Sequence, residues 1–329
     1  MVAEFLRGQG NKNTEGAPGD SRVNRLNQCN YQIIADESGT RLDRYVSERD
    51  PELSRTRAQK LIEEGNITVN CRVVKPSYKV QSGDKIEIRI PPPVPTTITP
   101  EQIPLKIVYE DSDLIVIDKP AGLTVHPAPG HYTHTLVHAL LAYAPDIATG
   151  DNQRPGIVHR LDKNTSGLIV VARNPVSHMN LADQFKKREV TKVYLVLVEG
   201  HVTPERGIIA SNIGRNPRNR KTMAVVSRGK EASTEYKVIK YIDGYTLLEV
   251  RPKTGRTHQI RVHLAAIGHP VAGDEIYGGK TQILGRQFLH AYRLGFRLPS
   301  SGEYVEFESP LPGDLSQALE KISQGKNVK

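Results

Sequence analysis

The residues best placed for chemistry lie in segment 159–167, His-Arg-Leu-Asp-Lys-Asn-Thr-Ser-Gly, which runs directly into the apolar stretch 168–172. Asp162 stands here between two cationic side chains, Arg160 and Lys163, just before an expected buried strand. A carboxylate in such a place is unfavourable unless it is paired with a cation or used in a reaction. An ordinary turn is the alternative, because Asp and Asn side chains often bond to their own backbone. This segment alone favours the ordinary turn, whereas the rest of the chain favours a carboxylate that takes part in a reaction.

Protein kinases and metal-dependent enzymes are excluded by what should accompany such a loop. The His-Arg-Leu-Asp order resembles a kinase catalytic loop, but the sequence has no Gly-rich phosphate loop, strand lysine or Asp-Phe-Gly segment. His258 and His263 are five residues apart without a His-Glu-x-x-His pattern, and His134 and His138 lack a partnering glutamate. The two cysteines are far apart, so neither a zinc-dependent deaminase nor a disulfide scaffold fits. We therefore predict no metal.

A second candidate segment, 251–263, holds three arginines, one lysine and two histidines and leads into an amphipathic run over 260–267. Its Arg256 and Arg261 are able to pair with a carboxylate or with phosphates. A solvated helix start is the alternative interpretation.

A third segment, 206–230, contains no acidic residue and is expected to repel itself unless it faces a polyanion. The net charge of +9 points the same way, and nucleic acid is the simplest such partner. A solvated basic loop is the alternative. The cations of this segment are Arg206, Arg215, Arg218, Arg220, Lys221, Arg228 and Lys230.

Tyr194 follows the basic run 186–188 and opens a very apolar strand. Most strand tyrosines only pack, but a tyrosine beside an extruded base can stack on it and also use its hydroxyl.

The first part of the chain predicts a tail and a small module. Residues 1–30 are polar and rich in Gly and Asn, as is typical of a tail, and 35–90 form the module. A helix is expected between an N-cap at Ser54 and a stop at Gly65. The cations outside its apolar stripe are Arg55, Arg57 and Lys60. Strands are expected at 67–69, from 73–74 onward and at 85–90, with a tight turn at Asn70-Cys71.

The proline-rich segment 91–103 predicts a stiff linker, followed by a main domain over 104–315 and a C-terminal tail over 316–329. Strands outnumber helices, which predicts an α+β domain around a mainly antiparallel sheet. Expected strands are 105–109, 114–117, 168–172, 193–198, 233–239 and 246–250, and expected helices are 135–143, 177–187 and 258–267.

The N-terminus has no apolar core of a signal peptide, and the apolar runs are too short to span a bilayer. We therefore expect a soluble cytoplasmic protein with no membrane partner, most simply a monomer.

Four motifs together resemble the RluA-type pseudouridine synthases, most closely the RluD-like branch with an N-terminal S4 RNA-binding domain. The similarity covers residues 35–315, and four motifs in one order make a chance match very improbable. They are DKPAGLTVHP at 118–127, RPGIVHRLDKNTSGLIVVAR at 154–173, KVYLVLVEG at 192–200 and RPKTGRTHQIRVHLAAIGHPVAGDEIYG at 251–278.

This resemblance implies isomerisation of uridine in RNA to pseudouridine without metal or cofactor. Large-subunit ribosomal RNA is the expected target, in free form or within pre-ribosomal particles. Asp162 matches the catalytic aspartate, as nucleophile or proton acceptor at the ribose, and Arg261 matches the arginine paired with it. Tyr194 matches the tyrosine that packs on the base and helps to remove the C5 proton. Arg160 matches a residue that fills the gap left by the flipped nucleotide. Further RNA contacts are expected from His159, Thr165, Arg256, His258, Arg215, Arg218, Arg220, Lys221, Arg55, Arg57 and Lys60.

Three positions depart from the family pattern. Asn164 stands where Asp is frequent, which affects loop hydrogen bonds rather than the carboxylate itself. Cys71 stands where Gly is common, and a positive φ would strain it, so we expect a different turn. Arg297-Leu298-Pro299 replaces the usual His-Pro, and the sequence offers no physical reason.

Overall fold

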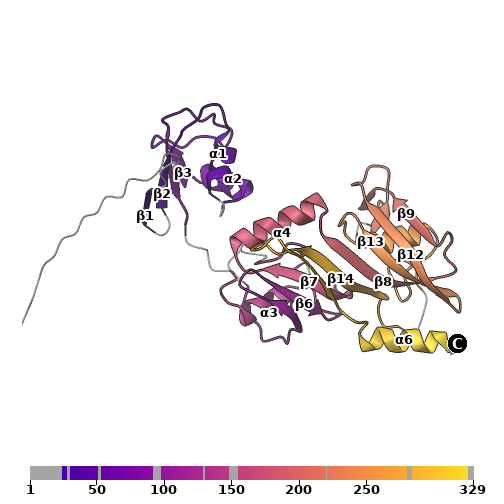
Figure 1. Cartoon of the computed structure of the whole chain (residues 1–329). Coiled ribbons are helices and arrows are strands. Elements are labelled where there is room, and N and C mark those ends of the chain that lie inside the picture. The colour runs from indigo at the N-terminus through magenta and orange to yellow at the C-terminus, as the bar shows by residue number, and fades with distance from the viewer. Residues whose placement is uncertain are drawn as a thin grey trace, which may run out of the picture. The chain divides into compact units, whose positions relative to one another are not determined.

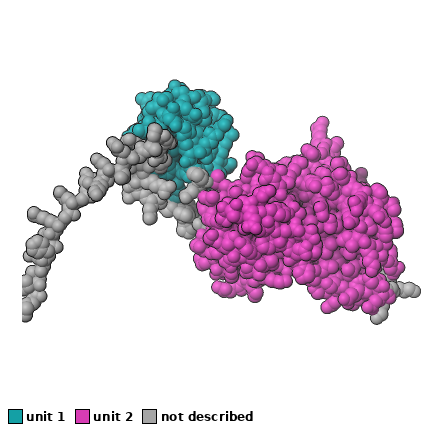
Figure 2. Space-filling model, viewed as in Figure 1, with its two compact units in different colours: residues 1–92 teal, residues 93–329 magenta. Residues whose placement is uncertain are grey.

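The computed structural model describes residues 24–27, 30–50, 53–91, 98–128, 130–147, 155–219, 221–279 and 284–324. The chain divides into two compact units, residues 1–92 and 93–329 (Figures 1 and 2). The predicted tail over 1–30 lies mostly outside the described residues, but its part 24–27 forms a strand.

The first unit is a four-stranded antiparallel sheet beside two helices (Figure 1). The strand order is β1-β2-β4-β3, and both helices bury apolar residues in the core that the sheet provides. Strand β4 alternates buried and exposed residues as predicted, and the Ser54 hydroxyl accepts a hydrogen bond from the amide of Arg57 as the N-cap of α2. The elements are β1 (Asn24–Asn27), β2 (Asn30–Ile34), α1 (Leu42–Arg49), α2 (Arg55–Glu63), β3 (Ile67–Val69) and β4 (Lys85–Arg89).

The turn after β3 corrects two expectations. Asn70 and Cys71 both have positive φ, 50° and 61°, so the cysteine adopts the left-handed conformation instead of changing the turn. Val69 and Arg72 exchange two backbone hydrogen bonds across it, which closes the tight turn. The chain at 73–74 forms no return strand, because β3 pairs with β4 instead.

The second unit is built on a nine-stranded sheet with order β5-β6-β7-β14-β8-β13-β12-β9, in which β15 also pairs with β14. Only the β14–β7 pair is parallel, which confirms the predicted α+β fold with a mainly antiparallel sheet. The strands are β5 (Ile107–Glu110), β6 (Leu114–Lys119), β7 (Ser166–Ala172), β8 (Thr191–Glu199), β9 (Arg206–Ala210), β12 (Ser233–Ile242), β13 (Tyr245–Pro252), β14 (Leu289–Arg297) and β15 (Tyr304–Glu308), and a separate hairpin joins β10 (Ile213–Arg215) to β11 (Met223–Val225).

Helices cover both faces of this sheet (Figure 1). Alternate residues of β6 and β7 pack against α3 (Leu136–Tyr143) and α4 (Pro175–Lys187), which therefore lie on opposite faces. At the other half of the sheet, α5 (Gln259–Ala266) packs against Val196 and Val198 of β8, and α6 (Gly313–Ser323) packs against the intervening Leu197. The loop that carries Asp162 joins the α3 side of the core through Leu161.

Several elements were missed from the sequence. Strand β9 begins in the segment expected to be a basic loop, and β14 is buried on both faces, so β14 shows no simple alternation. Residues 316–323 of the expected C-terminal tail belong to α6, which buries Leu315, Ala318 and Ile322. Ile98 of the expected linker packs against α3.

Arg297, the first residue of the Arg-Leu-Pro departure from the family pattern, is held by α4. Its backbone N–H and C=O both bond to the Gln184 side chain of that helix.

No helix among the described residues is both long and apolar enough to cross a bilayer.

The left-handed cysteine generates a prediction about the first unit. An L-residue with a side chain is disfavoured at this φ, and Gly is not. We expect Cys71→Gly to raise the free energy of unfolding of the first unit by about 0.5–1 kcal/mol, the steric gain being partly offset by the entropy of glycine. Native-state hydrogen exchange of the β3 and β4 amides measures this. Cys71→Ser keeps the Cβ atom and should give no gain; an equal gain in both variants would show that φ is not the cause.

Candidate active site

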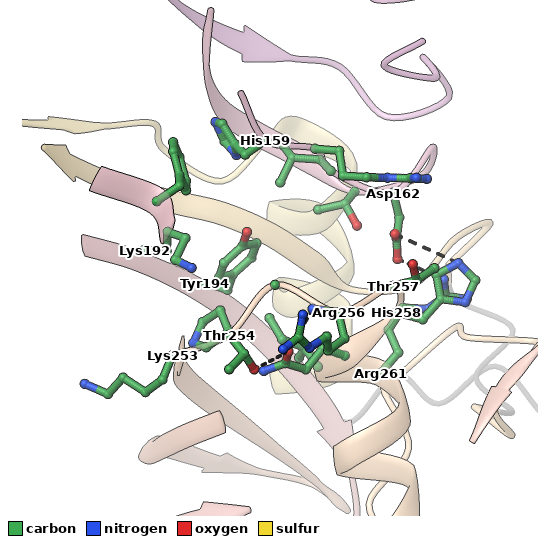
Figure 3. Close-up of a pocket in the computed structure, with 18 of the residues that line it drawn as sticks. His159, Asp162, Lys192, Tyr194, Lys253, Thr254, Arg256, Thr257, His258 and Arg261 are labelled. Carbon is green, nitrogen blue, oxygen red and sulfur yellow. Dashed lines mark hydrogen bonds and ion pairs between the residues drawn. The ribbon is translucent and has the colours of Figure 1, made fainter. Parts of the chain in front are cut away.

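A pocket of about 590 Å³ brings together residues of segments 159–167 and 251–263 and Tyr194 with the basic run before it, whereas segment 206–230 does not line it. One wall is the loop before β7 with Asp162, the floor is β8 with Tyr194, and the other wall is the segment from Pro252 to Arg261 (Figure 3). Tyr194 contacts the apolar core clusters of both α3 and α5, so the pocket lies where the two halves of this face meet.

Asp162 is held by one cation. Its Oδ2 accepts a hydrogen bond of 3.1 Å from Nη1 of Arg261, while its side chain keeps 18% of its surface exposed toward the pocket. The two residues are 99 positions apart in sequence. The carboxylate is thus fixed on one side and open on the other, as a group that acts on a ligand must be.

Arg261 is itself fixed by a second carboxylate. Its Nε and Nη2 donate to the two oxygens of Asp274 at 2.6 and 2.8 Å, and both side chains are almost fully buried. Burial alone opposes the charge, but the bonds and charges of Asp274 and Asp162 outweigh it and raise the pKa of Arg261. The guanidinium is therefore a permanent, oriented cation beneath Asp162.

Asp274 was not singled out from the sequence, although it lies in the quoted motif 251–278. Gly273 before it has φ 73° and no space for a Cβ, since the carbonyl of Arg286 would lie 2.3 Å away, but neither property can be read from the sequence. The Asp274 side chain is 1% exposed, and a carboxylate buried in this way requires a cation.

His258 is the second neighbour of Asp162. Its Nε2 lies 3.9 Å from Oδ1 of Asp162, and its Nδ1 lies 2.8 Å from the hydroxyl of Tyr277 (Figure 3). The Tyr277 oxygen also accepts the amide N–H of Met223, and its own proton is available for Nδ1, an arrangement that favours the tautomer with Nε2–H facing Asp162. Burial lowers the pKa of His258, against the opposing charge of Asp162, which favours this neutral ring. Tyr277 was not predicted.

Tyr194 reaches the pocket from β8. Burial and the charge of Asp162 both raise its pKa, so the phenol is protonated at neutral pH. Its ring offers a flat apolar face beside the carboxylate, which is suitable for an aromatic ligand.

Buried hydrogen bonds fix the loop that carries Asp162. The ammonium of Lys119 is fully buried and donates to the carbonyls of Pro120, Leu123 and Lys163 at 2.8–3.1 Å. The backbone carbonyl of Asp162 accepts the amide N–H of Thr165 at 3.0 Å and closes a turn, but the Asp162 side chain bonds Arg261 and not its own backbone, unlike the ordinary turn considered from the sequence. The backbone carbonyl of Asn164 accepts a hydrogen bond from Nη1 of Arg286. The departure from Asp at this position therefore leaves that contact unaffected.

Among the predicted RNA contacts in this loop, only Arg160 is exposed, at the rim of the pocket. Thr165 is 2% exposed and its hydroxyl lies 3.5 Å from the Gln287 amide, so it supports the loop and does not present a contact surface. His159 lines the pocket, but its Nε2 accepts the amide N–H of Val170 at 3.0 Å and its ring stacks on Phe185. Both side chains were assigned to RNA because sequence does not show where a loop residue points.

The remaining predicted contacts are dispersed. Arg256 lines the pocket, and its Nε donates to the carbonyl of Glu231. Lys192 beside Tyr194 adds a cation whose pKa is lowered to about 8 by burial and by Arg188 and Lys253. Arg215 and Lys221 belong to the β10–β11 hairpin and its turn, as does the exposed Arg218, whereas Arg220 lies outside the described residues.

The β10–β11 hairpin connects to the site, because the amide N–H of Met223 donates to the hydroxyl of Tyr277.

The three cations of α2 belong to the other unit. Arg55 bonds the buried Asp43 at 3.1 Å, and Lys60 lies 3.9 Å from Glu64. Arg57 is half-buried. Where the structure is described, no three His, Cys, Asp or Glu side chains lie together as metal ligands.

The position of His159 predicts an acid-sensitive fold. Burial and the charge of Lys192 lower its pKa to about 3, and the unfolded chain takes up this proton near pH 6.5. The unfolded state therefore binds more protons between these values, and stability falls as the pH falls through this window. From pH 7 to pH 5 we expect His159 to account for a loss of about 2 kcal/mol.

His159→Gln keeps an acceptor for Val170 N–H but does not titrate, so its unfolding free energy in urea should lose about 2 kcal/mol less than that of the wild type over this range. His201→Gln, at an exposed histidine outside the pocket, should behave as the wild type. An acid loss in His159→Gln as large as in the wild type would contradict the assignment.

Comparison with known proteins identifies the family. Residues 113–266 match the family model for RNA pseudouridylate synthase, and residues 40–86 match the S4 domain. An uncharacterized RNA pseudouridine synthase of Bacillus subtilis is 42% identical over 90% of this chain and 99% of its own. Ribosomal large subunit pseudouridine synthase D of Neisseria meningitidis is 41% identical over 89% of this chain and 81% of its own, and that of Nitrosomonas europaea is 39% identical over 98% and 96%.

Among solved structures, human RNA pseudouridylate synthase domain containing 1 matches 70% of this chain and 97% of its own with a TM-score of 0.54 and 31% identity. Sequence and structure therefore agree, and the chain belongs to the RNA pseudouridine synthase family, with an S4 domain in its N-terminal part.

Proposed function

We propose that this chain isomerises specific uridines of large-subunit ribosomal RNA to pseudouridine, with Asp162 as the catalytic carboxylate. The main support for the proposal is the Asp162–Arg261 pair. Its carboxylate is partly exposed to a pocket whose floor is formed by Tyr194. In this reaction the bond between C1′ and N1 breaks and a bond between C1′ and C5 forms. The proton leaves C5 and N1 gains one, so no other reactant is consumed.

Each of the three residues has a role that its surroundings support. Arg261 donates a hydrogen bond to Asp162 and aims it, so that the carboxylate can act at the ribose as a nucleophile or as a proton acceptor. Because its pKa is raised, the Tyr194 phenol stays protonated at neutral pH and offers no phenolate as a base, which favours Tyr194 as the surface on which the freed uracil stacks while it turns.

Access to this pocket requires the target base to leave its helix. The exposed Arg160 at the rim is suited to fill the gap in the RNA, and the cations of the β10–β11 hairpin and of α2 are suited to contact phosphates. The names of the relatives from Neisseria meningitidis and Nitrosomonas europaea support the large ribosomal subunit as the source of the substrate. We further propose a cytoplasmic monomer that acts on free RNA or on pre-ribosomal particles.

Two alternatives make different predictions. An RNA-binding module without catalysis would bind RNA in a salt-dependent way and form no product. It would not need the buried Asp274 that orients Arg261 beneath Asp162, so the geometry favours an enzyme. The same activity directed at transfer RNA or another ribosomal site is the second alternative, and it differs only in the substrate.

The test uses unmodified large-subunit ribosomal RNA and a transfer RNA pool, with carbodiimide-based mapping of pseudouridine after incubation with the protein. We expect modification of defined ribosomal uridines by the wild type and none by Asp162→Asn, while RNA affinity stays within about twofold because the carboxylate makes no favourable contact with phosphates. Asp183→Asn is the matched control, since Asp183 is an exposed partner of Lys187 on α4, outside the pocket.

Turnover by Asp162→Asn equal to that of the wild type would refute the catalytic assignment. Binding without any product in the wild type, on free RNA and on pre-ribosomal particles alike, would favour the binding module. Product in transfer RNA alone would move the proposal to that substrate.

A further inference from the structure

A second buried arginine, Arg286, lies behind the catalytic loop and outside the pocket. Its Nη1 donates to the carbonyl of Asn164 at 3.0 Å, and its Nη2 donates to the hydroxyl of Ser166 at 3.2 Å. These acceptors lie two and four residues after Asp162, on the segment that carries the carboxylate into β7. Arg286 therefore holds the catalytic loop through one backbone carbonyl and one side-chain hydroxyl, without lining the pocket.

The charge of Arg286 is balanced by the last helix. Asp314 in the first turn of α6 accepts hydrogen bonds from Nε and Nη2 of Arg286 at 2.6 and 3.1 Å. The hydrogen bonds from Arg286 lower the pKa of Asp314, so this carboxylate is ionised at neutral pH. Both oxygens meet the guanidinium, which fixes its plane and hence the direction of the N–H groups that reach the loop.

Buried groups hold both ends of this contact. The Ser166 hydroxyl also lies 3.0 Å from Nδ1 of His290, whose Nε2 lies 2.9 Å from the carbonyl of Ser309. The α6 helix is anchored by Leu315 and Ile322, both fully buried in the core. The catalytic loop, strand β7 and helix α6 are thus joined through the guanidinium of Arg286. A displacement of α6 would therefore also move the catalytic loop.

We propose that Arg286 and Asp314 are positioning residues for Asp162, through which the C-terminal helix sets the geometry of the catalytic loop. The guanidinium of Arg286 spans from Asp314 to Asn164 and Ser166, so the loop backbone has no freedom to turn Asp162 away from Arg261. The inference rests on the proposed function for its kinetic readout and on the structure alone for its exchange readout.

The test uses the full chain with Asp314→Asn. The side chain of Asp314 is 52% exposed and contacts neither the pocket nor the loop, so the variant should fold. An amide presents an NH₂ group where Arg286 needs an acceptor, which removes the two-oxygen fork. Glu308→Gln is the matched control, since Glu308 pairs with Arg293 at 2.7 Å on the surface of the same unit.

We expect Asp314→Asn to lower kcat about tenfold while KM and RNA affinity are unchanged, because the loop is misplaced and the binding surface is intact. Amide exchange should become faster in a peptide covering 161–167 and stay unchanged in β12 and β13. Glu308→Gln should match the wild type in both measurements.

An unchanged kcat, an unchanged exchange rate in 161–167, or an equal effect of Glu308→Gln would each overturn the proposal. If the wild type modifies no RNA, the proposed function fails, and the exchange experiment still decides whether Arg286 and Asp314 hold the loop.

Discussion

The structure depends on one guanidinium shared between two carboxylates. Arg261 is almost fully buried, and a buried charge is tolerated only when it is paired and hydrogen-bonded on every side. Asp274 satisfies two of its N–H groups from within the protein, and Asp162 accepts a third at the pocket wall. Because Asp274 already balances the charge of Arg261, Asp162 is oriented by the cation without being fully neutralised by it. An acidic side chain in this state is ready to act on a bound ligand.

The fold has to bring three distant segments to this point. Strand β8 places Tyr194 between the two apolar clusters, α5 presents Arg261 from its first turn, and the loop before β7 presents Asp162. A loop alone would be too mobile to hold a carboxylate within a few tenths of an ångström. Two buried cations remove that freedom: Lys119 bonds the carbonyl of Lys163, and Arg286 bonds the carbonyl of Asn164. The position of the loop is therefore set largely by contacts to its backbone carbonyls, and the direction of Asp162 by Arg261.

The sequence predicted the site better than it predicted what supports it. Asp162, Tyr194 and Arg261 were identified from motifs, and the structure brings them to one pocket. The partnership of Arg286 with Asn164 spans 122 residues, and no local pattern reveals a contact at that separation. His159 and Thr165 were assigned to RNA, yet the Thr165 side chain is buried, and His159, although it lines the pocket, bonds the backbone of Val170.

The secondary structure shows the same limit. Strands with one buried face, such as β4, were predicted from their alternation, whereas the central strand β14 is buried on both faces and shows none. Helix α6 did carry a signal, since its buried residues recur at helical spacing, but the segment is short and close to the end of the chain.

The kcat of Arg261→Lys shows whether the shape of the shared guanidinium matters. Lysine keeps the positive charge but presents a single ammonium, which cannot donate in parallel to both oxygens of Asp274 and also reach Asp162. We expect kcat on ribosomal RNA to fall about a hundredfold or more with RNA affinity unchanged, because Asp162 is no longer aimed. A kcat close to that of the wild type would contradict this expectation, since charge alone would then suffice and the shared guanidinium would have no role in catalysis.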